Sequence, residues 1–357
     1  MKICFLADGK SIHTQRWCRH FSSLGHEIHL ITFQPTEIEG TRVHHIDAGN
    51  ISVGGGNWRV ILKVGMVKRL LRHIRPDILH AMYATSYGIV GRLSGFHPFV
   101  LTALGTDVLI SPFRSVLYKL AVRSVLRKAD WITAMSDPMK AVLLDLGASP
   151  ERTDTVIFGI DTSLFNNVGR KLNLEKFVII STRNLEPVYQ IGLILDALNQ
   201  IKGKIPGMEV RIIGDGTLRS QLEEKVKNNE LSGFVHFKGK ISQKELVEQL
   251  KGSHLFISAS LSDGNNISLN EAMACGCYCL ASDIPPNRIW IREGENGFLF
   301  PVNSPEHLAD RILYVYNNFT DLSATAGPLN KRLINEKADW KLNMKEVESK
   351  YKLLISP

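Results

Sequence analysis

Residues 257–290 read ISASLSDGNNISLNEAMACGCYCLASDIPPNRIW, and this stretch decides the fold. The apolar run at 254–258 predicts a buried strand, and a polar loop, 262–266, follows it. A helical pattern covers 268–275 and ends at Gly276, after which 278–281 predicts a second strand. Strand, loop, helix and strand in this order form the repeating unit of a parallel sheet.

Such a unit places a helix N-terminus at the carboxyl edge of the sheet, where it favours an anion such as a diphosphate. Gly264 would let a ligand approach the backbone closely. Asp263 and Glu271 would repel a phosphate, so we expect them to accept hydrogen bonds from sugar and ribose hydroxyls. Two plainer readings stay open: Ser268 to Glu271 fits a capping box, and Asp263 fits an ordinary turn.

The residues of this stretch resemble a known signature. Asp263-Gly264, six further residues and Glu271-Ala-Met-Ala-x-Gly are similar to the motif of family 4 retaining glycosyltransferases, which have the GT-B fold. The family's first acid is usually glutamate, whereas this chain has Asp263. The continuation at 282–309, SDIPPNRIWIREGENGFLFPVNSPEHLA, resembles the family as well.

The whole chain alternates short apolar runs with longer helical patterns. The expected strands are 3–7, 27–33, 43–46, 78–80, 100–104, 131–134, 155–158, 177–181, 209–213, 235–238, 254–258, 278–281 and 297–300. This βαβ series occurs twice and predicts two doubly wound α/β domains, 1–160 and 161–357, with the boundary at FGID, 158–161. The resemblance implies two Rossmann-like domains facing across a cleft. It assigns the acceptor to the first domain and the nucleotide sugar to the second, and it implies that the last helix, about 343–355, crosses back to the first.

Composition excludes several classes of protein. No apolar run approaches the roughly 20 residues of a membrane helix, and the first strand is too short for a signal peptide, so we expect a cytoplasmic protein. Cys275, Cys277 and Cys279 lack the spacing of a zinc site. Residues 1–160 hold 19 Lys and Arg against 12 Asp and Glu, which predicts an anionic partner. Without a nucleic-acid-binding signature, an acidic membrane or acceptor is favoured over nucleic acid.

Two enzyme classes that share doubly wound sheets lack their own motifs here. The first strand is followed by DGKSIH rather than a dinucleotide fingerprint, and IIGDGTLR at 212–219 lacks the third glycine. A Walker A loop is absent too.

Glycosyl transfer from a nucleotide sugar must stabilise a leaving diphosphate. The sequence contains no Asp-x-Asp motif, so we expect no metal or other cofactor, and helix dipoles with basic side chains would meet the charge. The resemblance places Arg183 as the phosphate-clamping arginine. The family's following lysine is replaced by Tyr189-Gln190, and Tyr189 could donate only a neutral hydrogen bond. The resemblance also implies a donor-binding set: Gly214, Gly216, Gly239, Lys240, Gly264, Asn265, Asn266, Ile267 and Ser268.

The first domain is expected to supply the acceptor side. His13 and Gln15 follow the first strand, and His80 ends another; water-facing or structural roles for them stay open. Where many family members have a histidine in T-x-H-G, this chain has Leu104, followed by Gly105. Asp107 is our candidate for contact with acceptor or sugar, and no general base is identified.

Residues 58–75 and 113–128 are both basic and amphipathic. They would suit a peripheral enzyme on an acidic membrane, unless their apolar stripes pack on the sheet.

These observations predict a metal-independent, retaining hexosyltransferase-type enzyme. It would move a sugar from a UDP- or GDP-sugar to a glycan or lipid-linked glycan in cell-envelope polysaccharide or glycoconjugate synthesis. The alternatives are a nucleotide-sugar epimerase of the same fold and a non-catalytic binder of sugar nucleotides or polyanions. The oligomeric state is not predicted.

Overall fold

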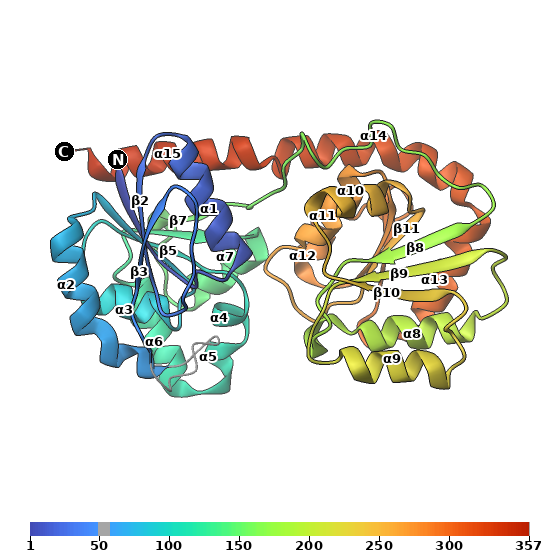
Figure 1. Cartoon of the computed structure of the whole chain (residues 1–357), viewed down its shortest axis with the longest axis horizontal. Coiled ribbons are helices and arrows are strands. Elements are labelled where there is room, and N and C mark those ends of the chain that lie inside the picture. Colours follow the sequence, from blue (N-terminus) through green and yellow to red (C-terminus); the bar gives the residue numbers. More distant parts are fainter. Residues whose placement is uncertain (49–57, 357) are drawn as a thin grey trace. The chain divides into compact units, whose positions relative to one another are not determined.

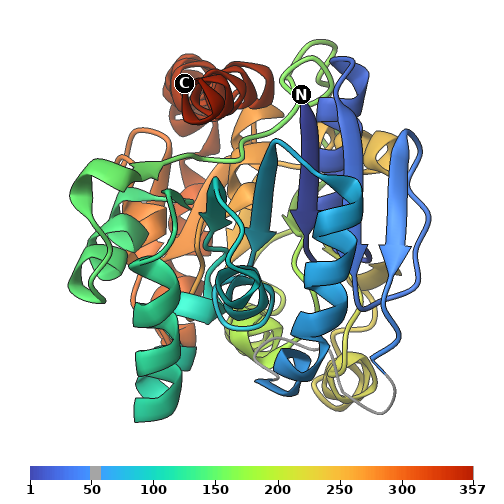
Figure 2. The same ribbon diagram turned by 90° about the vertical axis from the view of Figure 1, so that its left-hand side faces the viewer.

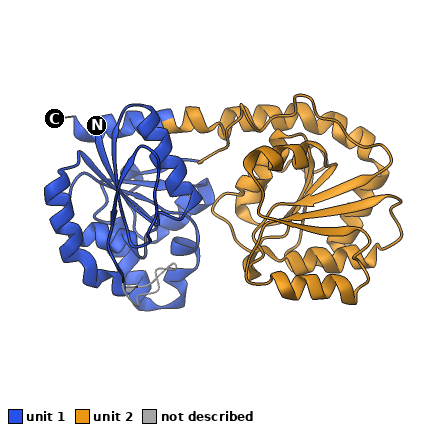
Figure 3. Ribbon diagram, in the orientation of Figure 1, with its two compact units in different colours: residues 1–157, 345–357 blue, residues 158–344 orange. Residues whose placement is uncertain are grey.

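The structure is a computed structural model that describes residues 1–48 and 58–356. The chain divides into two compact units, each with its own parallel sheet (Figure 3). Unit 1 comprises Met1–Ile157 and Lys345–Pro357, and unit 2 comprises Phe158–Met344.

The sheet of unit 1 has seven parallel strands within the described residues, in the order β3-β2-β1-β4-β5-β6-β7. Figure 2 shows these strands side by side with their arrowheads pointing the same way. The central strands are buried along almost their whole length, as expected for a parallel sheet covered on both faces. The bounds are β1 Lys2–Leu6, β2 Glu27–Thr32, β3 Thr41–His45, β4 Ile78–Met82, β5 Phe99–Thr102, β6 Trp131–Ala134 and β7 Thr153–Thr155.

Helices cover this sheet as a doubly wound fold requires. On one side α3 contacts α2 and α6, while α1 packs on β2 and α7 on β6 and β7 (Figure 1). The helical bounds are α1 Ile12–Ser23, η1 Trp58–Lys63, α2 Val64–Ile74, α3 Tyr87–Ser94, α4 Thr106–Leu109, α5 Ser111–Arg114, α6 Val116–Leu126, α7 Asp137–Asp145 and η2 Pro150–Arg152.

The sheet of unit 2 has six parallel strands within the described residues, in the order β10-β9-β8-β11-β12-β13. Its strands are β8 Phe177–Ser181, β9 Met208–Ile213, β10 Val235–Gly239, β11 Leu255–Ser258, β12 Tyr278–Ser282 and β13 Gly297–Phe300. Helix α8 packs with α9 and α13, and α11 packs with α14. The helices are η3 Pro187–Tyr189, α8 Ile191–Gln200, α9 Arg219–Asn228, α10 Gln243–Lys251, α11 Ile267–Ala274, α12 Pro285–Arg288, α13 Pro305–Asn317, α14 Phe319–Lys337 and α15 Trp340–Ile355.

The final helix, α15, belongs to both units. Its residues from Lys345 onward pack with unit 1, where the buried Tyr351 ring lies against Phe21 and Trp131. None of the helices in the described ranges combines the length and apolarity that crossing a bilayer demands.

The predicted fold class is confirmed: both sheets are parallel, and helices lie between most successive strands, although none lies between β2 and β3. The largest difference among the strands lies at β7, which is Thr153–Thr155 rather than the predicted 155–158. The predicted run is apolar because Val156 and Phe158 are buried without belonging to a strand.

Candidate functional site

The predicted signature loop lies at the carboxyl ends of β8 and β11 in unit 2. Arg183 follows β8, and its guanidinium donates to Asn266 Oδ1 at 2.9 Å and to Asp263 Oδ2 at 2.5 Å. Its side chain is 8% exposed and that of Asp263 is 15% exposed. The arginine that the resemblance selected and the first acid of the motif therefore form one buried ion pair. Parallel sheets of this kind bind ligands at this edge.

Asn266 is the N-cap of α11, because its Oδ1 accepts the Leu269 amide at 3.1 Å. The capping-box reading of Ser268 and Glu271 is therefore wrong: the helix starts at Ile267, and the Ser268 hydroxyl donates to the Thr182 carbonyl at 3.0 Å. Glu271 lies in the second turn of α11 and is half-buried. Its role at the sugar stays a prediction.

The neighbouring residues of the loop are held by a network of amide hydrogen bonds. Asn265 accepts the Trp290 indole N–H at 2.9 Å and donates to Asn270 at 3.1 Å. Asn266 donates to Ser258 at 3.0 Å and to Asn287 at 3.1 Å. This fixes the backbone at Gly264, whose predicted contact with a donor stays a prediction.

Two opposing effects act on the Asp263 carboxyl. Burial raises its pKa, and the Arg183 charge together with the Gly264 and Asn265 amides works in the opposite direction. Burial dominates, so the pKa lies above its ordinary value. The pKa of Asp263 therefore depends on its ion pair with Arg183.

Tyr189 occupies the place of the family's lysine, and its predicted hydrogen bond to the donor stays a prediction. Its ring lies under the Arg183 guanidinium, with the central carbon 4.3 Å from the ring centroid. This is a cation–π contact. Tyr189 thus acts on the arginine through its ring and helps to hold it in place.

The two predicted glycines of the β9–α9 loop have a packing reason. A Cβ at Gly214, where φ is +136°, would lie 2.4 Å from the Arg183 carbonyl oxygen, and one at Gly216 would lie 2.5 Å from that of Leu185. These glycines let the β9–α9 loop pack on the segment that carries Arg183. Their predicted contact with the nucleotide stays a prediction.

A shallow pocket of about 490 Å³ lies beside this loop. Lys240 lines it, next to Gly239 at φ +67°, whose carbonyl accepts the Gly214 amide at 2.9 Å. The Glu186 carboxylate accepts the hydroxyl and the amide of Thr217 at 2.6 and 2.9 Å. The other lining residues are Asn184, Asp215 and Gly216. The pocket combines backbone groups and one cation, Lys240, with two carboxylates, Glu186 and Asp215, and its predicted contact with the nucleotide stays a prediction.

Asp107 in unit 1 supports the structure and does not contact the acceptor or the sugar as predicted. It is completely buried, and its carboxylate accepts the amides of Ala84 at 2.7 Å, Gly105 at 2.8 Å and Leu104 at 3.2 Å. Burial raises its pKa, and these amides limit the rise. Because its acceptors are used by the chain, it ties the loops after β4 and β5 together.

The predicted acceptor-side role of His80 is also wrong, because His80 is a core residue of β4. It is completely buried, it pairs with the Tyr351 hydroxyl through Nδ1, and its Nε2 lies 2.7 Å from the Thr102 hydroxyl. Burial lowers its pKa to about 3. The plainer reading of a structural histidine is therefore the right one.

The remaining acceptor-side residues lie at the start of α1 and α4. Gln15 donates to the Gly9 carbonyl at 3.1 Å and so braces the loop after β1. Burial lowers the pKa of His13 to about 4. Gly105, at φ +145°, is the N-cap of α4 and takes a backbone conformation that suits glycine. Their contact with an acceptor stays a prediction.

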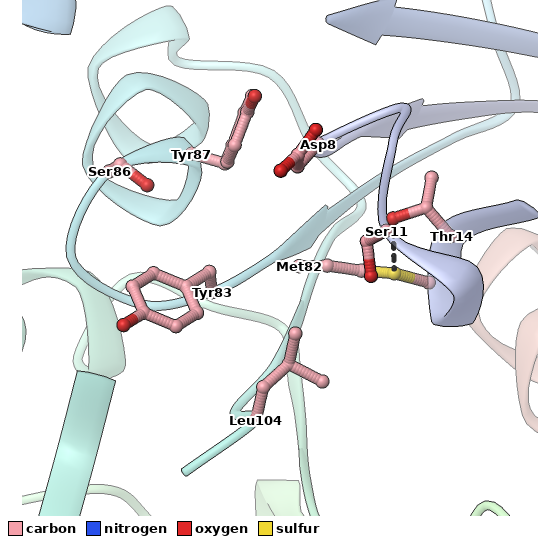
Figure 4. Close-up of a pocket in the computed structure, with 8 residues that line it drawn as sticks. All are labelled: Asp8, Ser11, Thr14, Met82, Tyr83, Ser86, Tyr87 and Leu104. Carbon is pink, nitrogen blue, oxygen red and sulfur yellow. Dashed lines mark hydrogen bonds between the residues drawn. The ribbon is translucent and has the colours of Figure 1, made fainter. Parts of the chain in front are cut away.

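Unit 1 has a cavity of about 220 Å³ that sequence reasoning did not identify (Figure 4). Asp8 and Ser11 contribute from the loop after β1, and Tyr83, Ser86 and Tyr87 from the segment after β4. Thr14, Met82 and Leu104 complete the lining. Their position directly after strands could have identified these residues. The sequence analysis singled out only Leu104 among them, because it stands in place of the family's histidine.

The cysteines of the signature stretch are core residues. Cys275, Cys277 and Cys279 are free and fully buried, and burial raises the pKa of the Cys277 thiol to about 12. Burial of this kind disfavours the thiolate that a metal needs. Within residues 1–48 and 58–356, no group of three or more His, Cys, Asp or Glu side chains is arranged to hold a metal ion.

The two amphipathic stretches differ in what they bury. In α2 the apolar stripe of Val67, Leu71 and Ile74 is buried, whereas Leu62 at 74% and Met66 at 48% are exposed in the same stretch. The α5–α6 surface is different: four large apolar side chains there are exposed, with Arg114 and Lys119 exposed among them. The four are Phe113 at 65%, Val116 at 74%, Leu117 at 77% and Leu120 at 56%.

Comparisons with known proteins agree with this geometry. Residues 2–136 match the family "Glycosyl transferase 4-like", and residues 166–338 match "Glycosyl transferases group 1". An uncharacterized glycosyltransferase of Methanocaldococcus jannaschii is 24% identical over 97% of this chain and 95% of its own length.

Two solved structures share the fold. Sucrose-phosphate synthase from Thermosynechococcus elongatus has a TM-score of 0.84 and 17% identity, covering 99% of both chains. Anabaena HepE, solved in complex with UDP-glucose, has a TM-score of 0.78 and 19% identity over 99% of this chain and 100% of its own. The fold of the chain is therefore GT-B. With matches in both units, the chain belongs to the group 1 family of glycosyl transferases and is a glycosyltransferase that uses a nucleotide-sugar donor.

Proposed function

We propose that the protein transfers a sugar, with retention of anomeric configuration and without a metal ion, from a UDP- or GDP-sugar to a glycan or lipid-linked glycan acceptor. One observation carries this proposal. Arg183, held at the carboxyl end of β8, lies beside the N-cap of α11 and the first acid of the signature. The Arg183 guanidinium, the N-terminus of α11 and the Asp263 carboxylate therefore lie close together.

The diphosphate of the donor binds at Arg183. Two nitrogens of its guanidinium are engaged, whereas the buried Nε–H finds no acceptor within the described residues. An arginine has five N–H donors in a fixed plane, so donors that Asn266 and Asp263 do not use are left for a phosphate oxygen. The positive end of α11 adds to the same field.

The two acids bind hydroxyl groups of the donor. Asp263 is at hydrogen-bonding distance from Arg183, and a phosphate on the arginine competes for that partner. Once released, the carboxylate accepts hydroxyls of the sugar or the ribose, and Glu271 does the same from α11. Arg183 and the helix replace the metal that other glycosyltransferases hold with Asp-x-Asp, a motif that this sequence lacks.

The test of this proposal measures nucleoside diphosphate release from UDP- and GDP-sugars, with and without a panel of glycan acceptors. Acceptor-dependent release with retained anomeric configuration, undiminished by EDTA, is the expected result. Glu271→Ala should abolish turnover without changing the melting temperature. Release without acceptor, or an epimerised donor as the product, would indicate an epimerase. If no donor were turned over, the protein would be a non-catalytic binder.

The acceptor is lipid-linked and is reached at the cytoplasmic face of a membrane, as in cell-envelope polysaccharide synthesis. The α5–α6 surface supports this, because the segment Ser111–Lys128 contains no acidic residue and exposes apolar and basic side chains together. Such a surface inserts shallowly into an anionic bilayer.

Co-sedimentation with vesicles tests the membrane contact. The protein should pellet with vesicles containing an anionic lipid and remain in solution with purely zwitterionic ones. Leu117→Glu should weaken pelleting by at least about tenfold. The matched control, Leu174→Glu, changes a leucine of unit 2 that is 97% exposed, and it should leave pelleting unchanged. Equal binding by all three proteins would refute the assignment of this surface.

A further inference from the structure

The cavity of unit 1 lies at the carboxyl ends of three neighbouring strands. Asp8 follows β1, Tyr83 follows β4 and Leu104 follows β5, and these strands are adjacent in the sheet. Tyr83 has φ +88°, which is a costly conformation for a residue with a bulky side chain. Strain of this kind persists where the surrounding structure enforces it, and it is concentrated at ligand sites.

The polar groups of the cavity are suited to hydroxyls. Ser11 and Ser86 are the N-caps of α1 and α3, yet neither hydroxyl caps its helix. The Asp8 carboxylate accepts the Lys10 amide at 2.9 Å through one oxygen. These side chains, all drawn in Figure 4, offer one strong acceptor and two hydroxyl groups that donate or accept.

Tyr87 adds a buried hydroxyl near Asp8. Its exposure is 2%, and burial together with the Asp8 charge raises its pKa, so it stays protonated. The Thr32 hydroxyl and the Phe33 amide also influence this pKa, but neither is in hydrogen-bonding geometry in the described part of the chain. A donor is therefore left beside an acceptor, a combination that a ligand hydroxyl satisfies at both ends.

The rest of the lining is apolar. Met82, Leu104 and the Tyr83 ring contribute carbon surface, and Leu104 is the residue that replaces the family's histidine. A pyranose has the same division, with hydroxyls around its edge and C–H groups on its faces. At about 220 Å³ the cavity is smaller than the roughly 300–1,000 Å³ of drug-sized sites, which limits it to about one ring.

The charge of the cavity selects among sugars. None of its eight lining residues is basic, and Asp8 is acidic. An anionic ring, such as a uronate or a sugar phosphate, would meet the like charge of Asp8 with no cation in the lining; Arg114 acts on Tyr83 only from outside the lining. A neutral ring meets no such repulsion.

We propose that this cavity binds one uncharged sugar ring of the acceptor, with the Asp8 carboxylate accepting its hydroxyls and Met82, Leu104 and Tyr83 covering its face. The proposal rests on the glycosyl transfer proposed above and names the chemical class of its acceptor.

Saturation-transfer NMR on the full chain tests the proposal. The probes are the methyl glycosides of glucose, galactose, mannose and N-acetylglucosamine, with methyl glucuronide and glucose 6-phosphate as anionic counterparts. At least one neutral glycoside should receive saturation and bind at least about tenfold more tightly than the anionic probes. Asp8→Asn and Asp8→Ala should each weaken it by about tenfold or more, the loss expected for a hydrogen bond to a charged group.

Two matched variants make the test specific. Asp145→Asn removes an exposed carboxylate from the end of α7 and should leave binding unchanged. Asp263→Asn should also leave it unchanged, because a loss there would assign the sugar to the donor site. Preferred binding of an anionic probe, no binding of any neutral glycoside, or unchanged binding in both folded Asp8 variants would overturn the proposal. A thermal shift with UDP on the same proteins checks the donor site separately, so failure of either proposal can be recognised.

Discussion

Asp107 in unit 1 and Asp263 in unit 2 both follow a strand, and burial raises the pKa of both. Their partners differ. Asp107 accepts backbone amides of Ala84, Leu104 and Gly105, whereas Asp263 accepts the side chain of Arg183. A carboxylate held by the backbone cannot exchange partners without breaking its loops. Asp263 also has the Gly264 and Asn265 amides nearby, but its side-chain partner Arg183 is the group to which the proposed phosphate would bind.

The same contrast extends to the surrounding residues. In unit 1, His80 and Asp107 are completely buried and tie strands and loops to one another. In unit 2, Arg183 keeps a buried donor without a partner in the described residues. The comparison therefore predicts that substitutions in the first set change stability, and that those in the second set change turnover.

The largest effect is expected for Arg183→Ala. Removing a cation that stabilises developing charge lowers kcat by about 10²–10³-fold, as loss of an oxyanion-hole donor does. Steady-state kinetics with the turnover substrate measure it, and the melting temperature shows whether the fold survives. Arg332→Ala, which removes an exposed arginine from α14, is the control and should retain full activity. Turnover within threefold of wild type for Arg183→Ala would remove the arginine from the reaction.

Asp107→Ala should lower the stability of the protein and leave its affinity for UDP unchanged. It leaves backbone amides of buried loops without acceptors, at a cost of about 3 kcal/mol in the free energy of unfolding. For a domain in the size range of unit 1, the melting temperature should fall by about 6–12 °C. The affinity for UDP, measured calorimetrically at a temperature where the variant is folded, should stay within about twofold. A tenfold loss of UDP affinity with an unchanged melting temperature would reverse the roles given to the two acids.

These two acids show how far the sequence could predict the structure. Apolar runs locate strands because buried strands need them, and the motif from Asp263 to Glu271 locates the loop between β11 and α11 because its spacing is specific. Neither signal reports which way a polar side chain points. Asp107 was selected for its place in a motif, although it turns inward. Asp8 follows a strand in the same way and turns toward a cavity.

His80 provides a pH test of the structural half of the comparison. Its pKa is about 3 when folded, against an ordinary 6.5, so between these values the unfolded chain binds a proton that the folded chain refuses. Its contribution is present above pH 6.5 and is lost as the pH falls. At about 1.36 kcal/mol per pKa unit, the loss reaches on the order of 2 kcal/mol by pH 5.

Urea unfolding at pH 7 and pH 5 measures this dependence. His80→Gln should be less stable than wild type at pH 7 and should lose about 2 kcal/mol less between the two pH values. His307→Gln, at an exposed position of α13, should keep the wild-type dependence. If His80→Gln also kept it, His80 would be protonated in the folded chain, and its place in the core of unit 1 would be wrong.

The smallest effect is expected at Tyr189, whose ring supports Arg183 from 4.3 Å. A cation–π contact contributes about 0.5–2 kcal/mol, so Tyr189→Ala should lower kcat/KM by about 2- to 30-fold. Tyr189→Phe keeps the ring and should stay close to wild type. Because the two variants differ in the ring and share the loss of the hydroxyl, equal losses would show that the hydroxyl acts directly. Tyr189 would then be a donor to the substrate, and Arg183 would need no aromatic support.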